Sequence, residues 1–292
     1  MKKLGWIGCG KMGSPMALNI IKKGYEMIVY DTVEACTRPL AEAGAKLASS
    51  PREVAEKADC FFTMLPNGKI LESVVTEENG ILAGISPGKI LVDMSTIAPG
   101  ESSRICKMIE GAGAEFLRAP VTGSTVLAAS ASLGVFASGK KEVFDKVLPV
   151  FEAISNNQQY LGTSEQSRVL KLAINLMLAG QLQLLAEAMV MIDKAGLDRA
   201  QAMSIIRTSA VGSPVLGYKT DNVVNHDYTP AFSVAMMEKD LDLALDYGKQ
   251  DHIALPMCAM TRQYLAAISG QGNGNLDFSY LVENWEKFHG EA

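Results

Sequence analysis

The chain has 292 residues, a formal net charge of −5 and a hydrophobic content of 48%. This length and apolar content are enough for one or two domains with a sizeable core. The acidic balance gives no general attraction to nucleic acid or to an anionic membrane surface, so we expect neither as a partner. The cysteines form no CxxC pair and the three histidines are far apart in sequence, so neither a disulfide framework nor a metal centre is expected.

The N-terminal segment has the order of a dinucleotide-binding fingerprint, with an apolar strand, a glycine-rich turn, an amphipathic helix and a second strand. In its GxGxxG turn, Gly8 permits the tight bend, Gly10 lets the backbone approach a pyrophosphate, and Gly13 allows close packing of helix on strand. Lys11 and Met12 complete the loop, and the free N–H groups of the helix start would face the phosphates. We expect this loop to bind a dinucleotide; a glycine-rich turn without a ligand is the alternative.

Asp31 follows the second strand and indicates which dinucleotide is bound. A carboxylate at this place accepts hydrogen bonds from the adenosine ribose 2′-hydroxyl and repels a 2′-phosphate, so NAD is expected in preference to NADP. Arg38 lies close enough in sequence to offer a 2′-phosphate a partner, which keeps NADP as the less favoured alternative. A role for Asp31 in capping a turn is the other alternative.

Further apolar segments alternate with helical ones, and each ends in a turn that contains proline, serine or threonine. They are residues 60–65, 90–94 and 115–117. Repeated βα units of this kind predict an α/β fold with a doubly wound parallel sheet of the Rossmann type. Ligands of such sheets bind beyond the carboxyl ends of the strands, where these turns would lie.

The apolar segment 163–194 predicts one long helix. Thr163 with Gln166 has the pattern of a capping box, and Gly196 lies just beyond the end as a C-cap. Its lysine, asparagine, glutamine and glutamate side chains would be costly at a bilayer centre, so we expect a buried helix between two domains and no membrane span.

The predicted domains are a dinucleotide-binding domain over residues 1–162 and an all-α substrate and dimerisation domain over residues 163–292, which includes the interdomain helix. Beyond that helix the pattern is helical, with a bend expected at residues 209–218. A connecting helix that is apolar and exposed would gain from pairing, so a homodimer or homotetramer is expected. No apolar h-region follows the N-terminal lysines, which favours a cytoplasmic location.

Taken together, the motifs resemble the β-hydroxyacid dehydrogenase family, which includes 3-hydroxyisobutyrate dehydrogenase, tartronate semialdehyde reductase and 6-phosphogluconate dehydrogenase. The resemblance covers essentially the whole chain. It lies in IGCGKMGSPMA with Asp31, TMLP at 63–66, VDMSTIAP at 92–99, APVTGS at 119–124, KLAIN at 171–175 and EKDLDLAL at 238–245. It implies an NAD-dependent oxidoreductase that acts on a small β-hydroxy acid, or reduces the corresponding semialdehyde, in a Rossmann domain followed by an all-α domain.

The resemblance also implies residue roles. Lys171 would be the catalytic acid/base, and Asn175 would orient the substrate. The partial burial expected of Lys171 favours the neutral amine that a proton acceptor requires. A snorkelling lysine, a helix–helix hydrogen bond from the asparagine and a solvated charge cluster around Lys239 are the structural alternatives. The remaining implied contacts are Ser95, Thr122 and Gly123 to the substrate carboxylate, and Leu65, Pro66, Thr96 and Lys239 to NAD.

The sequence departs from the family pattern around the expected substrate loop and before the catalytic lysine. Other side chains stand where the family commonly has glycine, serine or aspartate, and they would reshape the pocket: Arg118, Thr122, Ser124, Leu127, Ala131, Glu165 and Ser167. For Arg118 we favour a surface ion pair over contact with a second anionic group of the substrate. A non-catalytic dinucleotide-binding scaffold or sensor and an imine reductase on the same fold are the alternative functions; relatives of the latter kind usually replace the lysine.

Overall fold

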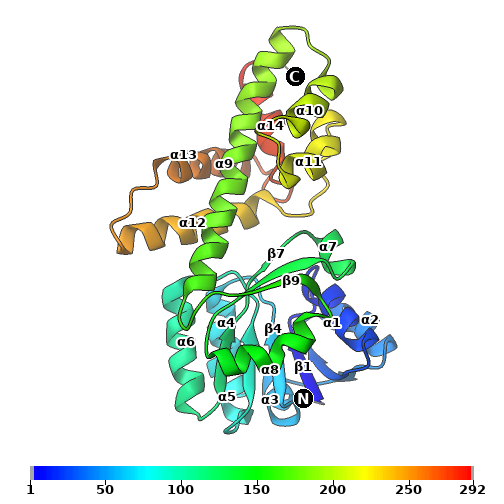
Figure 1. Ribbon diagram of the computed structural model, residues 1–292, viewed down its shortest axis with the longest axis vertical. Coiled ribbons are helices and arrows are strands. Elements are labelled where there is room, and N and C mark those ends of the chain that lie inside the picture. The colour runs from blue at the N-terminus through cyan, green and yellow to red at the C-terminus, as the bar shows by residue number, and fades with distance from the viewer. Residues whose placement is uncertain (1–2, 291–292) are drawn as a thin grey trace. The chain divides into compact units, whose positions relative to one another are not determined.

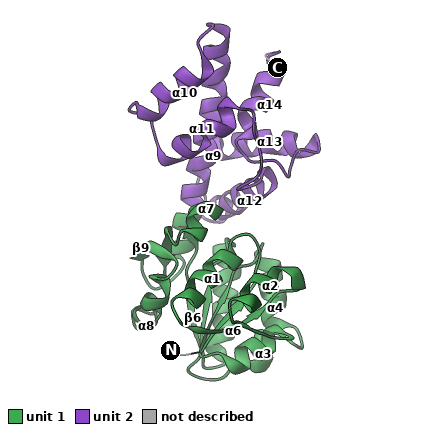
Figure 2. Ribbon diagram, turned by 90° about the vertical axis from the view of Figure 1, so that its right-hand side faces the viewer, with its two compact units in different colours: residues 1–171 green, residues 172–292 purple. Residues whose placement is uncertain are grey.

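The computed structural model of the protein describes residues 3–290 (Figure 1). The chain divides into two compact units, Met1–Lys171 and Leu172–Ala292, which Figure 2 distinguishes by colour. The division falls inside the long helix α9, Gln166–Lys194, whereas the domain boundary predicted from the sequence lies just before that helix. The first residues of α9 belong to unit 1 because Ser167 and Arg168 are buried in hydrogen bonds with the sheet and its loops.

Unit 1 contains a six-stranded sheet with the order β3-β2-β1-β4-β5-β6, in which all paired strands are parallel. This confirms the doubly wound Rossmann-type sheet. Its strands are β1 Lys3–Ile7, β2 Glu26–Tyr30, β3 Lys46–Leu47, β4 Cys60–Thr63, β5 Ile90–Asp93 and β6 Glu115–Arg118. The helices between them are α1 Gly13–Lys22, α2 Glu34–Glu42, α3 Pro51–Lys57, α4 Gly68–Thr76, α5 Ile81–Gly84 and α6 Pro99–Gly111.

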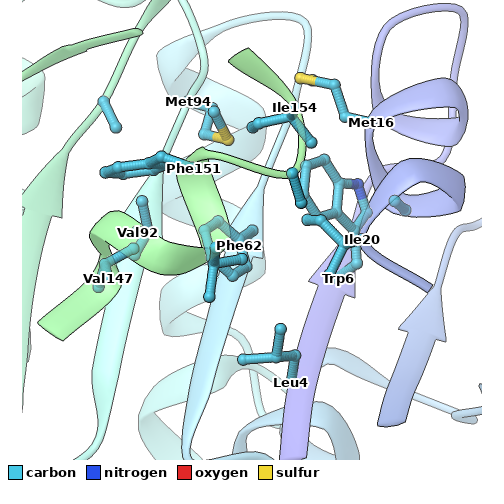
Figure 3. Packing of buried hydrophobic residues seen from close by; sticks show 14 of the residues in the cluster. Leu4, Trp6, Met16, Ile20, Phe62, Val92, Met94, Val147, Phe151 and Ile154 are labelled. Atoms are coloured by element: carbon cyan, nitrogen blue, oxygen red, sulfur yellow. The ribbon is translucent and has the colours of Figure 1, made fainter. Parts of the chain in front are cut away.

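Apolar clusters cover both faces of this sheet. Alternate residues of a strand point to opposite faces, so Trp6 and Phe62 enter one cluster while Phe61 enters the other. The rings of Trp6 and Phe62 stack at 5.4 Å, and Phe151 meets Phe62 edge-on at 6.4 Å (Figure 3). Burial on both faces explains why the central strands β4 and β5 are nearly continuous apolar runs with no polar alternation.

A second sheet in unit 1 was missed by the sequence analysis. Its order is β7-β8-β9, antiparallel between the first pair and parallel between the second. The elements are β7 Val121–Thr122, α7 Thr125–Ala129, β8 Leu133–Ala137, α8 Lys141–Phe151 and β9 Ser155–Tyr160. The strand β9 has the polar sequence SNNQQY, which carries no hydrophobic pattern to reveal it. The APVTGS segment at 119–124 is part of this sheet, because its residues Val121 and Thr122 form β7.

Unit 2 is helical, which confirms the expected all-α domain; within its described residues the one β-type pairing is the isolated bridge between Ser233 and Asp277. The bend predicted at residues 209–218 is confirmed for residues 209–213 and wrong for residues 214–218, because a helix begins at Pro214. The Ser213 hydroxyl accepts a hydrogen bond from the Leu216 N–H, and proline is well suited to a first helical position. The helices after α9 are α10 Arg199–Thr208, α11 Pro214–Val224, α12 Val234–Gln250, α13 Pro256–Gly270 and α14 Tyr280–Phe288.

The ends of α9 agree only in part with the prediction. Gly196 has φ +71°, and the Leu197 N–H closes the helix on the Ile192 carbonyl, as expected for a glycine C-cap. The capping box at Thr163 is wrong, because α9 begins at Gln166, whose side chain accepts from the Ser164 N–H at 2.8 Å. Among the described helices α9 has the length and hydropathy to cross a membrane, which core helices of soluble proteins share.

Candidate functional site

The carboxyl ends of the parallel strands lie in one row. Ile7 pairs with Tyr30 on one side and with Thr63 on the other, Thr63 pairs with Asp93, and Asp93 pairs with Arg118. The loops that follow therefore leave the sheet at a single edge. This is the edge at which doubly wound sheets bind their ligands.

Glycine is required at the three fingerprint positions for different structural reasons. Gly8 has φ +94°, and an added Cβ would lie 2.3 Å from the Met64 carbonyl oxygen. A Cβ on Gly13 would lie 1.9 Å from the Gly8 carbonyl oxygen. A Cβ on Gly10, by contrast, would meet no heavy atom of residues 3–290 within 4 Å. The backbone at Gly10 thus faces open space just before the start of α1, and this space fits a phosphate-bearing group held by the helix N-terminus.

The other loop residues predicted to contact the dinucleotide are all at least partly exposed to solvent. Lys11 is exposed and Met12 is the partly buried residue that precedes α1. In the loop after β4, Leu65 is partly buried and Pro66 is exposed, while Thr96 after β5 is partly buried.

Asp31 is fixed at the end of β2 by backbone donors. Its Oδ2 accepts from the Cys9 N–H at 2.6 Å and its Oδ1 from the Val33 N–H at 2.8 Å. The carboxylate thereby joins the glycine loop to β2. Burial, and then the negative charge of Asp31, raise the pKa of the Cys9 thiol to about 12, so this cysteine stays protonated beside the loop.

Ser95 is buried and its hydroxyl is already engaged within the protein. It donates to Asp93 Oδ1 at 2.7 Å and accepts from the Leu65 N–H at 2.9 Å. The Thr63 hydroxyl donates to the same carboxylate oxygen at 2.7 Å. The contact predicted between Ser95 and a substrate carboxylate stays a prediction. In the structure, the Ser95 hydroxyl links the loops that follow β4 and β5. Sequence analysis did not single out Asp93, whose signal was an acid at the end of an apolar strand.

Arg118 forms an ion pair, as we favoured, but the expectation of a surface pair is wrong. Its side chain is buried over the Phe116 ring, and its Nε donates to Glu165 Oε1 at 2.6 Å. Nearby, the hydroxyls of Ser138 and Ser167 hydrogen-bond at 2.7 Å. The side chains that depart from the family pattern at 118 and 165 therefore neutralise each other inside unit 1.

The predicted substrate loop follows β7. Thr122 is partly buried, and Gly123 has φ +129° with Leu133 only 2.7 Å from where a Cβ would stand. Leu127 is exposed and Ser124 is partly buried. Ala131 has φ +55°, a left-handed conformation that costs a residue with a Cβ roughly 1–2 kcal/mol. The backbone shape that a glycine would favour is thus kept although glycine is absent.

Unit 2 contains a buried polar cluster between α9 and α12. The Asn175 amide donates to Asp240 Oδ2, and Lys239 Nζ lies 2.9 Å from Asp240 Oδ1. The helix–helix hydrogen bond considered for Asn175 is therefore present, while its orienting role stays a prediction. Lys171, partly buried in unit 1, precedes Asn175 by four residues on the same continuous helix. Asp240 was not singled out from the sequence, where it stood among other charges.

One group among the described residues has metal-ligand character. Atoms of His226, Glu283 and Glu286 lie within 4.8 Å of one another. Arg199 contacts Glu286 at 2.6 Å and Lys287 contacts Glu283 at 2.9 Å. These cations already compensate the carboxylates, so the group is a set of ion pairs.

Two family comparisons together cover most of the chain. Residues 3–162 match the NAD binding domain of 6-phosphogluconate dehydrogenase. Residues 166–285 match a family described as NAD-binding of NADP-dependent 3-hydroxyisobutyrate dehydrogenase. The two descriptions support binding of NAD or NADP and do not separate them.

Individual proteins match over nearly their full lengths. The chain is 32% identical to 2-(hydroxymethyl)glutarate dehydrogenase of Eubacterium barkeri, with 99% of this chain and 96% of the relative covered. It is 31% identical to 2-hydroxy-3-oxopropionate reductase of Escherichia coli, with 97% of each covered. A structure of Mycobacterium tuberculosis 3-hydroxyisobutyrate dehydrogenase with L-serine has a TM-score of 0.88 at 27% identity, covering 97% of this chain and 98% of that one.

Replacing single glycines separates folding from ligand binding. For Gly10→Ala we expect an unchanged melting temperature and at least a tenfold weaker affinity for NADH, because the new methyl group meets only the open space beside the loop. Gly13→Ala, the matched control, should lower both, since its methyl group collides with the Gly8 carbonyl. Thermal unfolding and NADH fluorescence titration measure the two effects. Undiminished NADH affinity in Gly10→Ala would contradict the placement of the ligand.

Proposed function

Since the chain belongs to the β-hydroxyacid dehydrogenase family, a family of oxidoreductases, we propose that it transfers hydride between NAD and a small β-hydroxy acid, or reduces the corresponding semialdehyde. The observation that carries the proposal is Lys171, one turn before Asn175 on a helix whose start is fixed to the ligand-binding edge of a Rossmann sheet. A scaffold or sensor would need the dinucleotide loop but no such lysine.

In this proposal Lys171 handles the proton. Bound NAD would accept the hydride that leaves the carbinol carbon. As the substrate is oxidised, the Lys171 amine takes the hydroxyl proton; in the reductive direction its ammonium donates that proton to the carbonyl oxygen. Thr122 and the backbone at Gly123 hold the substrate carboxylate, and Asn175, itself held by Asp240, orients the reacting end.

Asp31 is the basis for proposing NAD over NADP. Its carboxylate is fixed by the Cys9 and Val33 N–H groups at the place where the adenosine ribose of a dinucleotide binds such folds. A 2′-phosphate there would meet a negative charge.

We expect the protein to bind NADH at least tenfold more tightly than NADPH, and Asp31→Asn to bring the two affinities to within about threefold. Removal of the charge abolishes the repulsion of the 2′-phosphate. Glu34→Gln, which neutralises an exposed acid in the first turn of α2, serves as the control and should leave the ratio unchanged. Fluorescence titration gives the dissociation constants. Equal affinities in the unmodified protein would remove the cofactor preference.

Lys171→Met tests the chemical step. Loss of the proton donor should lower kcat by about 10²–10⁴-fold, the range typical of general acid–base groups, while the NADH dissociation constant stays within threefold. A panel of β-hydroxy acids and small semialdehydes, followed by NADH absorbance, identifies the substrate first. Lys107→Met, at an exposed lysine of α6, is the control. A Lys171→Met protein that retains most of its turnover would refute the mechanism.

We also propose that copies of the chain pair through α9 as a homodimer or homotetramer. Met177, Leu184 and Met191 are 69%, 58% and 74% exposed. Their seven-residue spacing places them along one face of the helix, as in helices that pack on a partner helix. An apolar stripe of this kind in water is costly unless covered.

For Leu184→Glu we therefore expect the mass measured by sedimentation velocity to fall to that of a smaller assembly, because the carboxylate would be buried against the partner. Gln263→Glu adds the same charge at an exposed position of α13 and should not change the mass. A monomeric unmodified protein would rule out this assembly.

A further inference from the structure

Arg168, on the first turn of α9, is a buried cation that the proposed mechanism does not use. It is 1% exposed and stands with Trp6 and Phe61 among the largest fully buried side chains of the described chain. A buried guanidinium keeps its charge, so it requires an anion and hydrogen-bond acceptors around it.

Each nitrogen of the Arg168 guanidinium has an acceptor from the sheet edge or the helix behind it. Nη2 donates to Asp93 Oδ2, and Nη1 donates to the Ser95 carbonyl oxygen. Nε donates to the Ser102 hydroxyl on α6 at 3.3 Å. The fork of arginine reaches these three acceptors from three separate nitrogens, whereas a lysine carries all its donors on one atom. The start of α9 is thereby attached to the end of β5.

The same carboxylate extends this attachment to the neighbouring loop. Asp93 Oδ1 accepts from the Thr63 hydroxyl and from the Ser95 hydroxyl, both at 2.7 Å. Ser95 Oγ in turn accepts from the Leu65 N–H at 2.9 Å. A continuous chain of buried polar contacts therefore runs from Arg168 to the loops that carry Leu65 and Thr96. Every member of it, and Lys171, belongs to unit 1.

Stability alone is a weak reason for this arrangement. A buried ion pair loses most of its attraction to desolvation, and apolar side chains of similar volume often stabilise as well or better. What the network supplies is a fixed geometry, because hydrogen bonds are directional and these buried groups hold one another in a single arrangement.

We propose that Arg168 is a positioning residue: it locks the first turn of α9, and with it the backbone at Lys171, to the loops after β4 and β5 that bind the dinucleotide. The inference rests on the proposed function for the identity of the acid/base. Arg168 itself contacts neither substrate nor dinucleotide in this proposal. Its effect passes through Asp93 and Ser95 to the loops, and through the helix backbone to Lys171.

The test compares Arg168→Met with the unmodified protein in three measurements. We expect kcat to fall about 100-fold, the size of effect that a displacement of about 1 Å produces in an enzyme site. The NADH dissociation constant should rise three- to tenfold, because the loop at Leu65 loses its support. The melting temperature should also fall, since Asp93 is left buried without its cation.

Two further proteins separate positioning from general loss of stability. Lys219→Met breaks the equally buried Lys219–Asp277 pair of unit 2 and should lower the melting temperature while leaving kcat and NADH affinity unchanged. The double variant Asp93→Asn with Arg168→Gln removes both charges; it should regain the melting temperature but not kcat. This double variant decides the question if Arg168→Met does not fold.

A folded Arg168→Met or double variant with kcat and NADH affinity within twofold of the unmodified protein would overturn the positioning role. So would Lys219→Met if it lost as much kcat as Arg168→Met. Absence of turnover in the unmodified protein would instead refute the proposed function, and NADH affinity alone would then decide whether Arg168 supports the loops.

Discussion

The arrangement of the loops at the ligand-binding edge of the sheet depends on the buried carboxylate of Asp93. It stands at the end of β5, with no access to solvent, and an uncompensated carboxylate there would cost several kcal/mol. Its two oxygens are satisfied by Arg168, Thr63 and Ser95, which come from α9, β4 and the loop after β5. One desolvated charge thus requires three segments, far apart in sequence, to meet at a single place.

Much of the fold was predictable because its signals are local. The parallel strands are apolar runs between turn residues, and the order of strand, glycine turn, helix and acid identified the first βαβ unit. The three-stranded sheet was missed because β9 is polar and β8 contains glycine. The sequence predicts a bend over the first turn of α11 because proline usually interrupts helices, although Pro214 follows a serine N-cap and starts one.

In the candidate site, too, the residues in local motifs were predictable and those joined by long-range contacts were not. The glycine loop, Asp31 and the turns after β4 and β5 were visible as short motifs. The Arg168–Asp93 and Arg118–Glu165 pairs join residues 75 and 47 positions apart, and no spacing rule in a single sequence connects such residues. The left-handed backbone at Ala131 was indicated only by the resemblance, in which glycine is usual at this position, because an alanine alone gives no sign of that conformation.

The unequal surroundings of the fingerprint glycines bear on how such motifs are interpreted in other chains. Gly8 and Gly13 are each confined by a neighbouring carbonyl of this fold, whereas none of the residues that the structure describes confines Gly10. Glycine at the outer two positions is therefore required by the packing of the fold itself, and glycine at the middle position carries the information about a bound molecule. A descendant that kept the outer pair and changed the middle glycine would still look like a dinucleotide domain to any search that weights the three alike.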